Sequence, residues 1–289
     1  MAQMILCAVD DSEAAGRVLD TARWLADSLQ SGLVVLHVVD DGSSEADELV
    51  DRVRSRLGDV RVDLQQHSGS PAETIRDAAD REDADFVVVG SRGRGGLRSA
   101  VLGSVSRELV ADAHCPVVVV PSGERWALAP DDQGDGASVV CGVDGSDQAL
   151  DGAAFAGRLA QRLGCRLIVV HARQNLRAAL SYRGARSETP PVSGQSDAVE
   201  ELTADVLQRA VAAAGGSADG VIEPGPPAEV LESVANREAA RLIVITTRGL
   251  GGVRAALLGS VAGELTATAA RPVVVLSEAS ASAARAEVD

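Results

Sequence analysis

Two glycine-rich segments of the chain have the composition of a loop that binds phosphate groups. The first reads GSRGRGGLRSAVLGSVS over residues 90–106, follows an apolar run at 86–89, and contains three arginines but no acid. Glycine lets backbone N–H groups approach an anion closely, and the first N–H groups of a helix lack partners within the helix. The helix dipole adds partial positive charge at the same end. A strand, this loop and a helix that begins near Gly103 therefore predict a phosphate-binding site.

The second segment reads TTRGLGGVRAALLGSVA over residues 246–262 and repeats most of the pattern. The first copy has a glycine, two residues, a second glycine, nine residues and then Gly-Ser. The second copy keeps Gly249 and Gly259 at this spacing but has Thr246 in the first glycine position. One GxxG pattern is weak support for nucleotide binding, whereas the full spacing after a strand and before a helix, found twice, is strong support.

Differences between the two copies predict unequal sites. Thr246 adds a β-branched side chain where the backbone should approach the ligand. Ala262 replaces Ser106, which removes a hydroxyl. Leu250 replaces Arg94, which removes a charge. We therefore expect the first site to bind nucleotide tightly, and the second to bind it weakly or to take a smaller nucleotide.

The overall composition argues against a general basic surface but leaves room for a local one. The 289-residue chain has a formal net charge of −15, whereas nucleic acids and anionic membranes bind basic surfaces. We therefore expect no nucleic-acid partner and no membrane partner. All 27 basic residues are arginines, so no lysine can hold a phosphate or form a Schiff base. The arginines of the first loop, beginning with Arg92, form a cationic cluster within an acidic protein.

The amino terminus and the cysteines are typical of a cytoplasmic protein. The segment MAQMILCAVDDS has no basic stretch before its apolar run, and no run reaches the length of a membrane span. The four cysteines have neither CxxC spacing nor a nearby histidine at ligand spacing. Cys7 and Cys141 lie in equivalent apolar runs of the two halves. We expect buried thiols in a reducing compartment rather than disulfides or a metal site.

Apolar runs and helical patterns alternate along the first part of the chain. Ser12 is expected to cap the first helix. The alternation predicts a parallel sheet with helices on both faces and right-handed crossovers. Strands are expected at 5–9, 33–39, 60–66, 85–90 and 116–120, and helices at 13–29, from about 47 to 57, from Pro71 onward, and at 104–113.

A repeat divides the chain into two halves. Asp10 and Asp144 lie 134 residues apart, whereas Gly103 and Gly259 lie 156 residues apart. The difference of 22 residues is an insertion in the second half, near residues 173–196. The expected division is a first domain at 1–122, a linker at 123–137, a second domain at 138–278 and a flexible tail at 279–289.

With these motifs the chain resembles a tandem universal stress protein of the ATP-binding branch. The resemblance rests on AVDDS (8–12) and GVDGS (142–146), on LHV (36–38) and VHA (170–172), and on the two loops that end in GSV. It implies two α/β, Rossmann-like domains of the adenine nucleotide alpha hydrolase type. Each would be a five-stranded parallel sheet of order 3-2-1-4-5 with helices on both faces. It also implies that strands 117–120 and 273–276 pair within the chain as a built-in dimer, and it leaves a further homodimer open.

The resemblance further implies a site for adenine nucleotide, ATP in particular, at the carboxyl edge of the first and fourth strands, where open α/β sheets bind ligands. Asp10 would lie near the ribose and phosphates or hold Mg²⁺ through the phosphates, and the backbone of Val38 would contact adenine. The residues expected to surround the ribose and phosphates are Gly90, Arg92, Gly93, Gly103, Ser104, Val105 and Ser106. The corresponding residues of the second half are Asp144, Ala172, Thr246, Gly249, Gly259, Ser260 and Val261.

Other interpretations stay open at this point. Asp10 could equally cap the following helix, and His37 and His171, which end apolar strands, are expected to be core residues rather than catalysts. The chain could be an ATP-binding regulatory module, a slow ATPase, or a dimerisation scaffold that uses no nucleotide. The first strand is followed by DDSEAA rather than by a glycine-rich loop, which argues against a Rossmann dehydrogenase and an ATP pyrophosphatase. We expect a binding protein with at most weak ATP hydrolysis.

Overall fold

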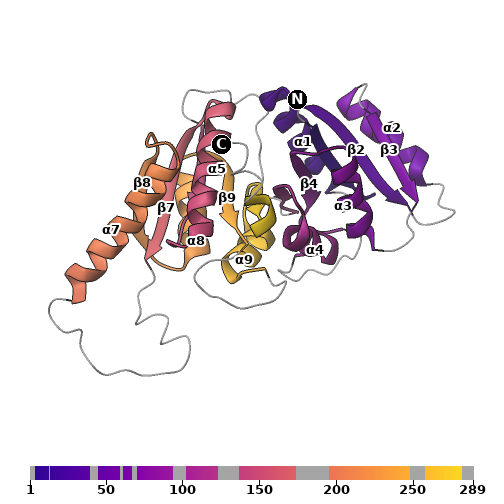
Figure 1. The fold of residues 1–289 in the computed structure, drawn as a ribbon. Helices are drawn as coiled ribbons and strands as arrows, with labels where there is room; N and C mark the ends of the chain where they lie inside the picture. The colour runs from indigo at the N-terminus through magenta and orange to yellow at the C-terminus, as the bar shows by residue number, and fades with distance from the viewer. Residues whose placement is uncertain are drawn as a thin grey trace.

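The structure, a computed structural model, describes residues 4–12, 14–39, 45–58, 61–66, 70–93, 102–122, 137–173, 195–247 and 258–281. Strands and helices alternate in both halves (Figure 1). The first half contains β1 (Met4–Val9), α1 (Ala15–Leu29), β2 (Gly32–Val39), α2 (Glu45–Leu57), β3 (Arg61–Gln66), α3 (Pro71–Arg81), β4 (Phe86–Gly90), α4 (Ser104–Asp112) and β5 (Val117–Val120). The second half contains β6 (Ser138–Gly142), α5 (Asp147–Leu163), β7 (Arg166–Arg173), α7 (Gln195–Ala213), β8 (Asp219–Pro224), α8 (Pro227–Arg237), β9 (Ala240–Thr246), α9 (Ser260–Thr268) and β10 (Val273–Leu276).

The described strands form one sheet in the order β3-β2-β1-β4-β5-β10-β9-β6-β7-β8. Within each half every pairing is parallel, which gives the order 3-2-1-4-5 twice and confirms the expected fold. In the middle, β5 and β10 pair antiparallel, with Val118 opposite Val274. Because the strands of the two halves run in opposite directions, their carboxyl ends lie at opposite edges of the sheet.

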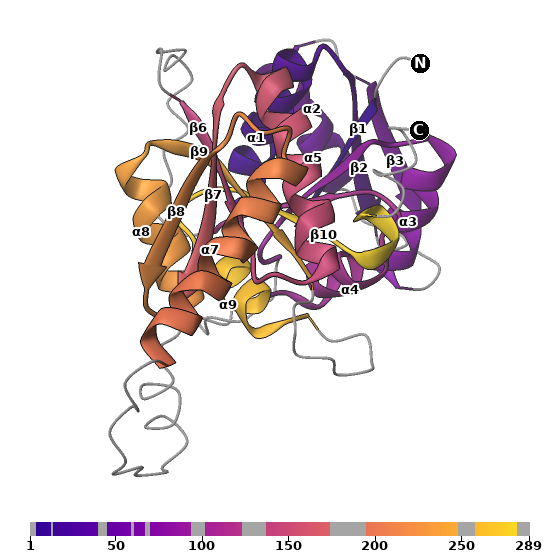
Figure 2. The same cartoon turned by 60° about the vertical axis from the view of Figure 1, so that its left-hand side comes forward.

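Two apolar layers cover the faces of the sheet. One layer packs α1, α2, α5 and α7 against the strands, and Figure 2 shows α5 and α7 in front of the strands of the second half. The other layer contains residues of α3, α4, α8 and α9. The central strands are almost entirely apolar because both of their faces are buried. These layers fix the strand ends that carry the candidate sites.

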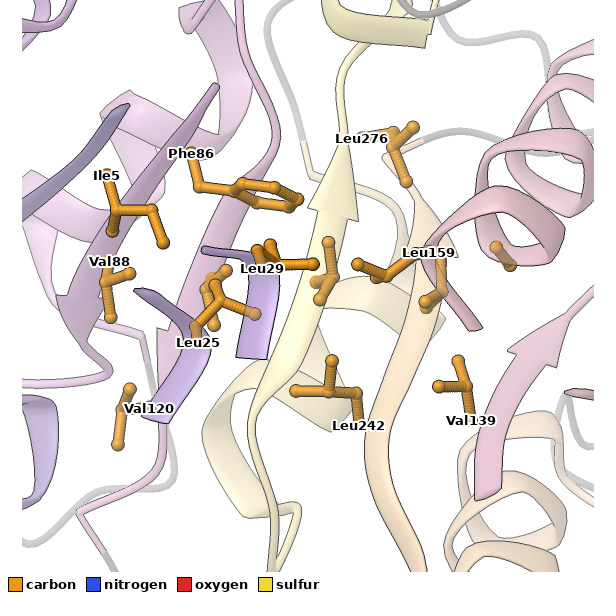
Figure 3. Close-up of a cluster of buried hydrophobic side chains, with 14 of the residues drawn as sticks. Ile5, Leu25, Leu29, Phe86, Val88, Val120, Val139, Leu159, Leu242 and Leu276 are labelled. Atoms are coloured by element: carbon orange, nitrogen blue, oxygen red, sulfur yellow. The ribbon is translucent and has the colours of Figure 1, made fainter. Parts of the chain in front are cut away.

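The first apolar layer continues from one half into the other (Figure 3). The rings of Phe86 on β4 and Phe155 on α5 lie 6.0 Å apart between their centroids. At the end of α1, the carbonyl oxygen of Leu29 accepts a hydrogen bond from Arg162 Nη2 on α5 at 3.2 Å. The two halves therefore share a continuous core as well as a continuous sheet.

The start of α1 differs from the expectation. The helix begins at Ala15 with Ala14 at its N-cap, and no side chain of the described residues caps it. Ser12, which the sequence suggested as the cap, lies before this point and makes no such bond. The first turn of α1 therefore lacks the serine cap that the sequence suggested, and the Ser12 hydroxyl is not committed to it.

The chain after β10 is also more ordered than a frayed tail. The hydroxyl of Ser277 donates to the carbonyl oxygen of Ala113 at 2.8 Å, and Ser280 and Ala281 are buried. Residues 282–289, the rest of the expected flexible tail, lie outside the described residues. In the described part of the chain, no helix is both long enough and apolar enough to cross a membrane.

The buried thiols should make the stability of the fold depend on alkaline pH. Cys7 and Cys141 are buried and free, as the sequence predicts. Burial raises the pKa of Cys141 from 9.0 to about 12. In the unfolded chain this thiol ionises at its ordinary pKa, so its stabilising contribution is complete below that pKa and is lost as pH rises toward the folded value. We expect Cys141 alone to remove roughly 1 kcal/mol from the free energy of unfolding between roughly pH 8 and pH 10.

Urea unfolding of the native chain and of Cys141→Ala across this pH range measures the effect. The chain has no lysine and one tyrosine, and burial also raises the pKa of the other three cysteines, so the difference between the two proteins isolates Cys141. The variant should lose stability less steeply with pH than the native chain, by about the amount given above. Equal pH dependence of the two proteins would contradict a thiol that stays un-ionised in the fold.

Candidate functional site

The first candidate site lies where β1 ends. Asp10 follows β1, and its Oδ1 accepts a hydrogen bond from the backbone N–H of Ser12 at 3.1 Å. A Cβ atom placed on Gly93 would lie 2.7 Å from Asp10 Oδ2. The loop after β4 therefore passes directly over the Asp10 carboxylate, and a side chain at position 93 would displace it. The fold thus brings together two residues that the sequence assigned to one site.

The described part of this loop is fixed against the start of α4. Gly103 is the N-cap of α4, and its N–H donates to the carbonyl oxygen of Ser91 at 2.9 Å. A Cβ atom placed on Gly103 would lie 3.6 Å from Arg92 Cα and 4.0 Å from Gly93 N. The loop and the helix start therefore form one backbone surface. The loop residues 94–101, with two of its three arginines, lie outside the described residues.

Helix α4 begins with N–H groups that no side chain caps. The N-cap Gly103 has no side chain, and the described residues supply no side-chain capping bond at this end of the helix. The N–H groups of Ser104, Val105 and Ser106 therefore have no partner within the helix, and they lie at the positive end of its dipole. This is an arrangement to which phosphate groups bind in other proteins.

Ser106 uses its hydroxyl inside the fold. The side chain is buried, and Oγ donates to the carbonyl oxygen of Gly90 at 2.6 Å. The hydroxyl ties the end of β4 to α4, so Ser106 can offer a ligand its backbone N–H but not its hydroxyl. Ala262 in the second half therefore removes a positioning hydrogen bond, and not a ligand-binding group as the sequence suggested.

Several buried side-chain polar atoms have no hydrogen-bond partner among the described residues. Two of these atoms are donors at the first site, Ser12 Oγ and Arg92 Nε. Buried polar atoms without partners are rare in folded proteins, and each one marks a place where water, an ion or a ligand can bind. Both groups can donate a hydrogen bond. The site therefore has spare donors and suits a ligand rich in acceptors.

The end of β2 carries a histidine with a structural role. His37 is buried, and its Nδ1 lies 2.9 Å from the carbonyl oxygen of Val9. The second half repeats this contact between His171 and Val143 at 2.9 Å. A carbonyl oxygen only accepts, so Nδ1 carries the proton in both rings. Each histidine ties the second strand of its half to the first, and Val38 packs beside it against the second apolar layer.

The second candidate site repeats this backbone geometry at the opposite edge of the sheet. Asp144 Oδ1 accepts from the N–H of Ser146 at 3.0 Å. Gly259 is the N-cap of α9, and its N–H donates to the carbonyl oxygen of Thr247 at 2.8 Å. The remaining residues assigned to this site are Ser260 and Val261 at the start of α9, Ala172 in β7, and Gly249, which lies outside the described residues.

The Thr246 side chain packs against a helix, and the expectation that it hinders a ligand stays a prediction. A Cβ atom placed on Gly152 in α5 would lie 2.8 Å from Thr246 Cγ2, so the threonine occupies the space that this glycine leaves. In the first half, a Cβ atom on Gly90 would lie 3.5 Å from Cγ2 of Val18 in α1. Val18 and Gly152 are 134 residues apart, the same offset as the aspartates. In the first half the larger residue, Val18, is on the helix and the glycine is at the strand end. In the second half the larger residue, Thr246, is at the strand end and the glycine is on the helix.

The described residues hold no ready-made metal site. Nowhere among them do three or more His, Cys, Asp or Glu side chains gather in a way that could hold a metal ion. Asp10 can supply one carboxylate. Mg²⁺ at this edge would take its other ligands from phosphate oxygens and water, which is its usual coordination beside nucleotides.

Comparison with known proteins agrees with this architecture. The sequence model of the universal stress protein family matches residues 1–121 and 137–277. A universal stress protein of Mycobacterium bovis is 33% identical over 198 residues, which is 67% of this chain and 62% of the relative, less than two thirds of its length. One of Mycobacterium tuberculosis is 30% identical over 271 residues, 90% of this chain and 84% of the relative. The crystal structure of a universal stress protein from Archaeoglobus fulgidus has the same fold, with a TM-score of 0.65 at 21% identity, covering 95% of this chain and 98% of that one. The chain therefore belongs to the universal stress protein family, with two of its domains in tandem.

Proposed function

We propose that this universal stress protein binds adenine nucleotide, ATP in particular, at the carboxyl edge of β1 and β4, and that it acts as a regulatory module in a stress response. The observation that carries the proposal is the position of Gly93, where an added Cβ atom would meet the Asp10 carboxylate, beside the buried unpaired donors Ser12 Oγ and Arg92 Nε. The uncapped first turn of α4 adds backbone donors. A carboxylate for Mg²⁺ or a ribose hydroxyl, next to a donor-rich backbone surface, matches the groups of a nucleotide.

Each part of the nucleotide has residues that suit it. The backbone of Val38, at the end of β2, would contact adenine. The backbone of Gly90, Gly93 and Gly103 would lie along the ribose and phosphates, because none of these residues has a side chain that stands in the way. Ser104, Val105 and Ser106 would donate their N–H groups to phosphate oxygens, and Arg92 would add a positive charge.

We also propose that the first site binds nucleotide more tightly than the second. Support comes from Ser146, the counterpart of Ser12. Its hydroxyl donates to Asp144 Oδ1 at 2.7 Å and accepts from the N–H of Ala149 at 3.2 Å, so it is committed inside the protein. The first site therefore has a hydroxyl to offer that the second lacks.

The proposal is tested by titrating ATP with Mg²⁺ into the full chain in a calorimeter, beside Asp10→Ala and Asp144→Ala. The two variants remove the matched carboxylate from each half. We expect two classes of site in the native chain, loss of the tighter class in Asp10→Ala, and loss of the weaker class in Asp144→Ala. No heat and no thermal shift in the native chain would reject nucleotide binding, and loss of the tighter class in Asp144→Ala would reverse the ranking.

A further inference from the structure

Ser12 is held by its backbone while its hydroxyl stays unused. Its N–H donates to Asp10 Oδ1 at 3.1 Å, and its carbonyl oxygen accepts from the N–H of Ala15 at 3.1 Å. Both backbone groups are therefore fixed in the turn between β1 and α1. The hydroxyl oxygen is buried and has no hydrogen-bond partner among the described residues. Such a group costs free energy unless something binds to it.

The same serine in the second half is fully used. Ser146 Oγ donates to Asp144 and accepts from the third residue of α5, Ala149, as an N-cap. Helix α5 begins at Asp147, whereas α1 begins two positions later in the repeat, at Ala15. The first half therefore lacks the serine cap that the second half has, and the Ser12 hydroxyl lacks the hydrogen bond that such a cap would make.

The residue before each serine explains the difference. Gly145 has a φ of +90°, which L residues rarely adopt. The equivalent residue in the first half is Asp11, which is not among the non-glycine residues with positive φ. The turn that places Ser146 over the helix start is therefore available to the second half only. A single exchange of glycine for aspartate leaves the hydroxyl of Ser12 without a cap to make.

We propose that Ser12 Oγ donates a hydrogen bond to a phosphate oxygen of the nucleotide at the first site, and that this bond distinguishes the first site from the second. The inference rests on the proposed function. The spare donor Arg92 Nε and the N–H groups of α4 make this edge favourable for an anion. The Asp10 carboxylate beside Ser12 can share Mg²⁺ with the same phosphates.

The test compares Ser12→Ala with Ser146→Ala in the full chain, using ATP with Mg²⁺ in the calorimeter. Ser12→Ala should weaken ATP binding at the tighter site about 10-fold and should not lower the melting temperature without ligand, since the hydroxyl is unpaired there. Ser146→Ala should leave that affinity unchanged and should lower the melting temperature by about 2–4 °C, because a helix cap is lost. The two serines should thus separate binding from stability.

Two further measurements define the bond. Adenosine, measured by competition against ATP, should bind Ser12→Ala and the native chain equally, because it has no phosphate. Asp11→Gly, which permits the turn of the second half, should engage the Ser12 hydroxyl and weaken ATP binding while it raises the melting temperature. An unchanged ATP affinity in Ser12→Ala, or an equal loss for adenosine, would overturn the inference. Absence of ATP binding in the native chain would instead reject the proposed function.

Discussion

Replacing Gly93 by alanine is expected to leave the chain folded and to weaken ATP binding at the first site by about 10–100-fold. The added Cβ atom would lie 2.7 Å from Asp10 Oδ2, closer than atoms pack. The obstacle is a side-chain atom, so the carboxylate can turn away and the backbone can stay. Asp10 then leaves the position in which it faces the loop. Loss of one hydrogen bond to a charged group costs about 1.5–3 kcal/mol of binding free energy, which corresponds to the 10–100-fold weaker ATP binding stated above.

Calorimetry with ATP and Mg²⁺ measures this loss, and the chain offers a matched control. A Cβ atom on Gly263 in α9 would lie 3.8 Å from the nearest Leu258 atom, an ordinary contact, so Gly263→Ala should leave the first site unchanged. The double variant Asp10→Ala with Gly93→Ala should bind no more weakly than Asp10→Ala alone, because both changes act on one carboxylate. Unaltered ATP affinity in Gly93→Ala would show that Asp10 does not serve the site.

Replacing Gly152 by valine is expected to lower the free energy of unfolding by about 2–3 kcal/mol, and removing the Thr246 side chain should restore most of it. The new Cβ atom would lie 2.8 Å from Thr246 Cγ2, within a packed interface of α5 with β9. Thr246→Gly alone should cost about 1–2 kcal/mol, since it opens a cavity and puts glycine into a strand. The double variant copies the pair Val18 and Gly90 of the first half.

Urea unfolding of the native chain, both single variants and the double variant forms a thermodynamic cycle. We expect a coupling free energy of about 2 kcal/mol in favour of the double variant. Additive effects of the two substitutions would mean that Thr246 does not occupy the space beside Gly152.

The sheet and the position of the first site follow from the sequence for clear physical reasons. A run such as Val117–Val120 is apolar throughout because both faces of a central strand are buried. Carboxyl ends of adjacent parallel strands meet at one edge, so Asp10 after β1 and Gly93 after β4 had to lie near each other. Glycine spacing then identifies the loop, since it reports where a backbone approaches something closely.

The roles of Thr246, Ser106 and Ser12 could not be read from local patterns. Two of these roles depend on a contact with a distant residue: Gly152 for the threonine, and the Gly90 carbonyl for Ser106. A signal existed for the first of these. The 134-residue offset that aligns the aspartates also aligns Val18 with Gly152, and it shows the exchange of large and small residues. For Ser12, the signal was the glycine that precedes its counterpart in the second half.

The central claim, that the first half holds an adenine nucleotide, is tested most directly by the contents of the purified protein. The native chain and Gly93→Ala would be denatured, and any released small molecule identified by chromatography and mass. We predict ATP or another adenine nucleotide from the native chain and clearly less of it from the variant, because the variant binds at its first site about 10–100-fold more weakly. A native sample that releases no nucleotide and shows no thermal shift with added ATP and Mg²⁺ would contradict the account.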